Sequence, residues 1–100
     1  MSHEECCCRR IKERTEEERR QLIHRLNRIE GQVRGVRGMV EKECYCTDIL
    51  TQVSAIQSAL NAFSRELLAN HIRTCVADGI RQGDEDVVDE LVCVLQKMMK

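Results

Sequence analysis

Several common ingredients of globular proteins are scarce in this chain of 100 residues. It has no proline and no tryptophan, and its aromatic side chains are one tyrosine and one phenylalanine. A core must therefore be built from aliphatic side chains, and no proline ring interrupts a helix. Because alanine, leucine, arginine, glutamate and glutamine favour helices, the sequence predicts an all-α fold.

Long apolar runs are also absent. No run approaches the roughly 20 residues that span a bilayer, and the stretch MSHEECCCRR at the start lacks the apolar segment of a signal peptide. We therefore expect a cytoplasmic protein that does not associate with membranes. In a reducing compartment, seven cysteines indicate metal or redox chemistry rather than structural disulfides. A chain of this length buries only a modest core, so we also expect oligomerisation.

The apolar spacing predicts a flexible arm over residues 1–14 and a single all-α domain over residues 15–100. The first helix, from about 15 to 42, has apolar residues three or four positions apart. They are Leu22, Leu26, Ile29, Val33, Val36 and Val40. Three glycines interrupt this helix, at a cost of about 1 kcal/mol each. They predict that another helix packs closely there, with a hinge as the alternative. They are Gly31, Gly35 and Gly38.

A second stripe with the same spacing runs from Cys46 towards a helix end near Gly83. Its members are Cys46, Ile49, Val53, Ile56, Leu60, Phe63, Leu67, His71 and Cys75. Asp84 can then cap a third helix. That helix carries Val88, Leu91, Leu95 and Met98. We therefore predict three helices joined by short connections.

His71 and Cys75 lie one turn apart, a good spacing for two metal ligands. Cys46 lies on the same stripe, whereas Cys44 falls nearly opposite. Twenty-five residues separate Cys46 from His71, about 38 Å along a helix, and residues 47–78 contain no glycine or proline that would bend it. Two copies paired antiparallel, with a two-fold axis near Leu60, would set Cys46 of one chain against His71 and Cys75 of the other.

Two thiolates and one imidazole form a soft ligand set, which favours three-coordinate Cu(I), with zinc and nickel as competitors. The alternative is that Cys46, His71 and Cys75 are ordinary core residues. Their common seam and their matched antiparallel register favour the metal site.

The charge of the chain is −1 overall but unevenly placed. Between Arg19 and Arg37 there are six arginines and a single acid, Glu30. Such a segment suits the phosphates of DNA, although a merely solvated helix face is the alternative. The candidate DNA-binding residues are Arg20, Arg25, Arg28, Arg34 and Arg37.

Three segments together resemble the CsoR/RcnR family of metal-sensing repressors. They are RLNRIEGQVRG at 25–35, CYCTDILTQVSAIQSAL at 44–60 and HIRTC at 71–75. The resemblance implies a dimer of dimers that holds operator DNA without metal and releases it when the inducer binds, derepressing genes for copper efflux or resistance. It implies Cys46, His71 and Cys75 as the copper ligands. It further implies that Tyr45 lies beside them, with Glu90 as the nearest candidate for a neighbouring glutamate.

The family's inducers differ with the ligand set. Nickel and cobalt sensors carry an N-terminal histidine where this chain has Arg14, persulfide sensors lack the histidine found here as His71, and formaldehyde sensors lack the second cysteine, here Cys75. Each departure points to Cu(I). A sensor of nickel, zinc or reactive sulfur on the same scaffold remains the alternative.

Other classes of function are less well supported by the sequence. A copper storage or chaperone bundle would not need the arginine-rich helix. An enzyme is not expected, because no third group accompanies His71 and Cys75 as a thiol and its base. His3 and the cluster Cys6, Cys7 and Cys8 are interpreted as accessory or dispensable metal-capturing residues, and Cys93 as a small core residue.

Overall fold

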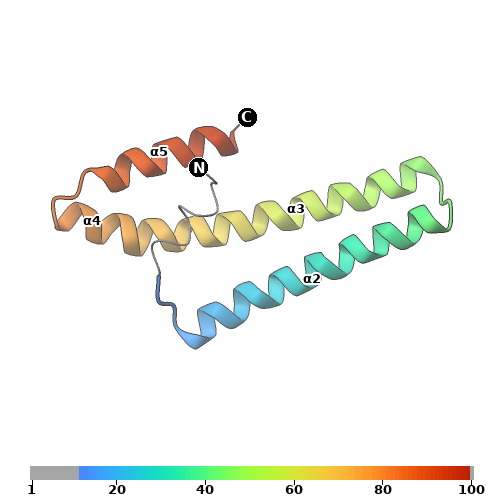
Figure 1. Ribbon diagram of the computed structural model, residues 1–100, viewed down its shortest axis with the longest axis horizontal. Helices are drawn as coiled ribbons and strands as arrows, with labels where there is room; N and C mark the ends of the chain where they lie inside the picture. Colours follow the sequence, from blue (N-terminus) through green and yellow to red (C-terminus); the bar gives the residue numbers. More distant parts are fainter. Residues whose placement is uncertain (1–11, 100) are drawn as a thin grey trace, which may run out of the picture.

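The computed structural model describes residues 12–99, and the regular structure in that range is entirely helical (Figure 1). A long helix is followed by a continuous rod and then by a shorter helix. The elements in chain order are α2 (Glu16–Glu41), α3 (Cys46–His71), the π-helical turn η1 (Ile72–Val76), α4 (Ala77–Arg81) and α5 (Asp86–Met98). Because α3, η1 and α4 form one rod, the predicted all-α class and three-helix order are confirmed.

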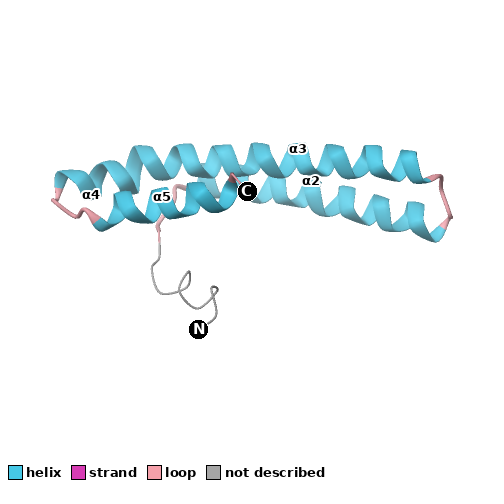
Figure 2. Cartoon of the chain, turned by 90° about the horizontal axis from the view of Figure 1, so that it is seen from above, coloured by secondary structure: helices cyan, strands magenta, loops and turns pink. Residues whose placement is uncertain are grey.

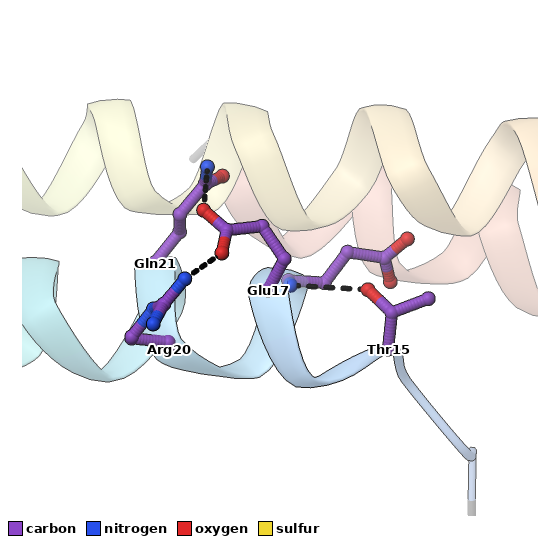
Figure 3. Close-up of polar contacts among 5 residues, drawn as sticks. Thr15, Glu17, Arg20 and Gln21 are labelled. Atoms are coloured by element: carbon purple, nitrogen blue, oxygen red, sulfur yellow. Dashed lines mark hydrogen bonds and ion pairs between the residues drawn. The ribbon is translucent and has the colours of Figure 1, made fainter.

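Local chemistry explains where α2 begins and ends. The hydroxyl of Thr15 accepts a hydrogen bond from the backbone N–H of Glu18, at 3.1 Å (Figure 3), and so satisfies one of the free donors at the helix start. Three glutamates in the first turn also stabilise the helix start, because their negative charges interact favourably with the positive end of the helix dipole. At the other end, the N–H of Lys42 bonds to the carbonyl oxygen of Gly38, and Glu43 adopts a left-handed φ of 57°.

The rod ends where the sequence predicts. Gly83 has a φ of 79°, a left-handed conformation that costs glycine little. The carboxylate of Asp84 then accepts a hydrogen bond from the backbone N–H of Asp86, at 3.0 Å, at the start of α5. Gly83 therefore has the predicted stop role, whereas the N-cap position of α5 is Glu85 and Asp84 binds the N–H of Asp86 from one residue before it.

The chain folds back on itself twice. Helix α2 lies along α3, whereas α5 returns from α4 and packs against η1 and α4 (Figures 1 and 2). Gly79 in α4 is buried where α5 approaches, and a Cβ placed there would lie 2.7 Å from Cγ2 of Val87. Only glycine fits at this crossing without movement of its neighbour.

The α2 stripe divides into two halves. Leu22, Ile29 and Val36, seven residues apart, are buried or half-buried against α3. The alternate stripe residues are exposed, and they are Leu26, Val33 and Val40. The sequence predicts one stripe, and the structure shows that α3 of the same chain covers only half of it.

The hydrophobic core of one chain is correspondingly thin. Among residues 12–99 only Ile29 and Val76 are buried hydrophobic side chains, with 8% and 5% of their surface exposed. Exposed apolar side chains continue along the rod and α5, and they include Leu50, Leu60, Ile72, Ile80, Val88, Val92 and Met98. So much exposed apolar surface is typical of a subunit that pairs with others.

The glycines of α2 do not have the predicted close packing partner within the chain. A Cβ at Gly31, Gly35 or Gly38 would meet nothing within 4 Å. The prediction is therefore wrong for the single chain, because α3 covers a different face of α2. Among residues 12–99, no helix has both the length and the apolar character needed to cross a lipid bilayer.

Candidate metal centre and nucleic-acid interface

His71 and Cys75 lie at the junction between α3 and η1. His71 is the last residue of α3, Cys75 lies within η1, and both are half-buried. The turn is widened, since the N–H of Ala77 bonds to the carbonyl oxygen of Ile72, five residues earlier. π-Helical turns of this kind are frequent at functional sites, and this one contains Cys75 and directly follows His71.

Cys46 lies at the opposite end of the same helix. It is the first residue of α3 and is exposed. The helix between Cys46 and His71 is uninterrupted, so the two side chains are about 38 Å apart along its axis. Within residues 12–99, no three histidine, cysteine, aspartate or glutamate side chains come together as a metal site. One chain thus brings His71 and Cys75 together but not Cys46.

The two residues implied to flank the ligands are also separated. Tyr45 precedes Cys46, has 73% of its surface exposed and makes no side-chain capping bond. Glu90 is half-buried on α5, the helix that packs against η1. In one chain, Glu90 therefore lies on an element next to the His71 and Cys75 end, and Tyr45 lies at the Cys46 end.

The structure adds a residue that sequence reasoning missed. Lys12 is half-buried, and its Nζ donates hydrogen bonds to Oδ1 of Asn70 and, at 2.6 Å, to Oγ1 of Thr74. These partners directly precede His71 and Cys75. No local pattern could reveal contacts that span 58 and 62 residues. Lys12 falls in the predicted arm, of which His3, Cys6, Cys7 and Cys8 lie outside the described residues.

The five candidate DNA-binding arginines are all exposed on α2 but differ in their partners. Ion pairs join Arg20 to Glu17, Arg34 to Glu30 at 2.8 Å and Arg37 to Glu41 at 4.0 Å (Figure 3 for Arg20). No such pair holds Arg25 or Arg28 within residues 12–99.

Some arginines of the segment therefore pair with glutamates that lie outside it. Glu17 and Glu41 lie beyond its ends but one helical turn from an arginine. Among the five candidates, Arg25 and Arg28, in the middle of α2, are the two without an ion-pair partner in the described part of the chain. Exposed pairs of this kind are weak, so the paired arginines can still exchange a glutamate for a phosphate.

Two further cysteines lie apart from these ligands. Cys44 is half-buried in the connection before α3, and its backbone N–H bonds to the carbonyl oxygen of Met39 at 2.9 Å. Cys93 is exposed, so its interpretation as a core residue is wrong. The covered face of α5 instead holds Val87, Leu91 and Leu95, and Cys93 lies on its solvent side.

Comparisons with known proteins agree with this arrangement. The family model described as "Metal-sensitive transcriptional repressor" matches residues 18–97. The copper-sensing transcriptional repressor CsoR of Bacillus subtilis is 45% identical over 91 residues, which is 90% of each chain.

Two solved structures are similar to this one. The Cu(I)-bound copper-sensing repressor CsoR of Geobacillus thermodenitrificans aligns with a TM-score of 0.85 and 47% identity, over 90% of this chain and 95% of that one. The nickel-responsive regulator InrS aligns with a TM-score of 0.69 and 32% identity, over 87% of this chain and 96% of that one. With the family model matched over residues 18–97 and a relative 45% identical over 90% of each chain, the chain belongs to the metal-sensitive transcriptional repressor family.

Proposed function

We propose that this protein is a cytoplasmic Cu(I)-responsive repressor, which binds operator DNA without metal and releases it when Cu(I) binds. The observation that carries the proposal is the distribution of soft ligands along one uninterrupted helix. Two of them, His71 and Cys75, lie one turn apart at one end, and the third, Cys46, lies at the other. A single chain cannot bring all three ligands to one metal ion, whereas a two-fold pair of chains can.

An antiparallel pair of α3 helices would complete two such sites. Residues whose numbers add up to about 119 lie opposite one another when Cys46 is set against the 71–75 turn, so the two-fold axis passes near Leu60. Leu60 has 44% of its surface exposed in the single chain, and its neighbours Ile56 and Phe63 are half-buried. Apolar surface therefore remains for a partner where the axis requires it. A tetramer would form from two such dimers, as the resemblance to the CsoR/RcnR family implies.

The donor set determines which metal fits. Two thiolates and an imidazole bind Cu(I) well as a three-coordinate set, and the three proposed ligands include no carboxylate as a fourth protein ligand for a tetrahedral zinc site. The Cu(I)-bound relative is also more similar to this chain than the nickel-responsive one, at 47% against 32% identity. That nickel-responsive relative supports the second candidate, a nickel or zinc sensor on the same scaffold.

Metal binding would act on DNA through the geometry of the long helices. Cys46 of one chain and the His71 and Cys75 pair of the other would be held in one register, and each α2 packs along its own α3. The arginines of α2 would then change their spacing against the phosphates. The resulting coupling free energy is about 1–3 kcal/mol, provided that the metal prefers the geometry that does not bind DNA.

An operator-binding titration tests the proposal. The metal-free protein first selects its operator from random duplexes, and the affinity for a labelled copy is then measured under reducing conditions with Cu(I), Ni(II), Zn(II) or no metal. We expect tight binding without metal and release with Cu(I). Release by nickel or zinc alone would favour the second candidate, and Cu(I) binding without any operator binding would indicate a storage or chaperone protein instead.

A further inference from the structure

A cation from the N-terminal segment lies beside the 71–75 turn. Lys12 Nζ donates to the side-chain oxygens of Asn70 and Thr74, the residues immediately before His71 and Cys75. Lys12 is half-buried, and no salt bridge joins it to a carboxylate within residues 12–99. Within those residues, the partners of its charge are therefore two neutral oxygens and not a carboxylate.

Thr74 connects this cation to the thiol of Cys75. The Thr74 hydroxyl accepts from Lys12 at 2.6 Å, donates to the carbonyl oxygen of Asn70 at 2.8 Å, and lies 3.7 Å from Cys75 Sγ. The sum of the first and last distances is the upper limit on the separation of Nζ from Sγ. At such a separation, in a partly buried setting, one unit charge stabilises another of opposite sign substantially.

The sign of this effect depends on the metal. Cu(I) with two thiolates and a neutral imidazole leaves the site with a net charge of −1, whereas a divalent ion on the same ligands leaves it neutral. A fixed ammonium group stabilises the first complex and does little for the second. We propose that Lys12, held by Asn70 and Thr74, is a specificity residue that favours monovalent over divalent metal at the His71 and Cys75 site. This inference rests on the proposed function.

The test compares monovalent and divalent affinities in matched variants of the full-length protein. Lys12→Met keeps the length of the side chain and removes its charge, Lys12→Arg keeps the charge, and Lys97→Met removes an exposed charge at the far end of α5. Affinities for Cu(I) and Zn(II) are measured by competition with chromogenic chelators under reducing conditions. We expect Lys12→Met to weaken Cu(I) binding about fivefold and Zn(II) binding by less than about twofold.

The controls separate charge from structure. Lys12→Arg and Lys97→Met should bind both metals like the parent, and added salt should shrink the Cu(I) effect of Lys12→Met. Adding Lys12→Met to Thr74→Val should cost less Cu(I) affinity than Lys12→Met costs alone, because the cation has already lost one of its two anchors. Equal losses for the two metals, an unchanged Cu(I) affinity, or additive losses in the double variant would each overturn the proposal for Lys12. If the parent itself does not bind Cu(I) tightly, the proposed function fails as well.

Discussion

The two ends of the α3 rod differ in how much of a site the single chain builds there. At one end Cys46 is exposed, and the Tyr45 beside it has 73% of its surface exposed. At the other end His71 and Cys75 are half-buried, where α3 runs into the π-helical turn that α5 packs against. In the proposed site, the His71 and Cys75 end is largely built within one chain, and the Cys46 end would be completed by a partner. In a two-fold antiparallel pair, the His71 and Cys75 end of each chain meets the Cys46 end of the other.

The strongest test of this difference between the two ends is to remove a ligand from one end in one chain and from the other end in a second chain. Cys46→Ala and Cys75→Ala should each reduce Cu(I) affinity more than about 100-fold, because losing a ligand exceeds the loss from a neighbouring group. Dimers refolded from an equal mixture should recover one tight site per mixed dimer, which a chelator competition titration counts. Mixed dimers that bind no more Cu(I) than their parents would contradict a site shared between chains.

His71 should matter more for signalling than for holding the metal. In a His71→Ala protein, Cys46 and Cys75 can still bind Cu(I) linearly, but the register of the two rods is no longer fixed. We expect the coupling between Cu(I) and operator binding, about 1–3 kcal/mol in the parent, to fall towards zero. Operator affinity with and without Cu(I) measures it. A His71→Ala protein that binds Cu(I) and still releases DNA fully would contradict this route.

The stability of the protein should also be more sensitive to packing changes at the end of the rod that carries His71 and Cys75. In Gly79→Ala the new Cβ would lie 2.7 Å from Val87 Cγ2, so we expect a loss of about 1–3 kcal/mol in the free energy of unfolding. Gly31→Ala is the matched control, because a Cβ there meets nothing and should stabilise the helix by up to about 1 kcal/mol. Urea denaturation at a fixed protein concentration measures both. If Val87→Ala does not relieve the Gly79→Ala defect, the crossing is not its cause.

A smaller effect should distinguish arginines along α2. Arg25 has no carboxylate partner in the described chain, whereas Arg34 is paired with Glu30 at 2.8 Å. Arg25→Ala should therefore weaken operator binding more than Arg34→Ala, and should reduce the slope of log affinity against log salt by about 1. A salt series with the metal-free protein provides both numbers. Equal effects of the two substitutions would mean that the ion pair between Arg34 and Glu30 costs little free energy to break when Arg34 binds a phosphate.

Much of the fold could be predicted because it depends on near neighbours in the chain. Thr15 and Asp84 both accept hydrogen bonds from backbone N–H groups at helix starts, and Gly83 ends the rod with a positive φ. Each role depends on a residue type and on neighbours a few positions away. The prediction that one straight helix keeps Cys46 and His71 apart has the same basis, and α3 is indeed uninterrupted.

The errors came from assigning faces. Cys93 was expected in the core and is exposed, because α5 meets the rod through Val87, Leu91 and Leu95. The arginine-rich segment contains one acid, Glu30, as counted from the sequence, but Glu17 and Glu41, one helical turn from Arg20 and Arg37, also pair with its arginines. Spacing shows that a helix has an apolar side. It does not show which part of that side the same chain covers.

The sequence by itself determined the helices and their ends, since these follow from residue types and from spacings of three or four. The soft ligand set is a prediction from the same residue types and spacings. Only the tertiary structure decided that half of the α2 stripe stays exposed, that α4 and α5 cross at Gly79, and that Lys12 bonds to Asn70 and Thr74. The physical reason is distance along the chain. Contacts across 58 and 62 residues depend on how whole helices pack, and no local pattern encodes that.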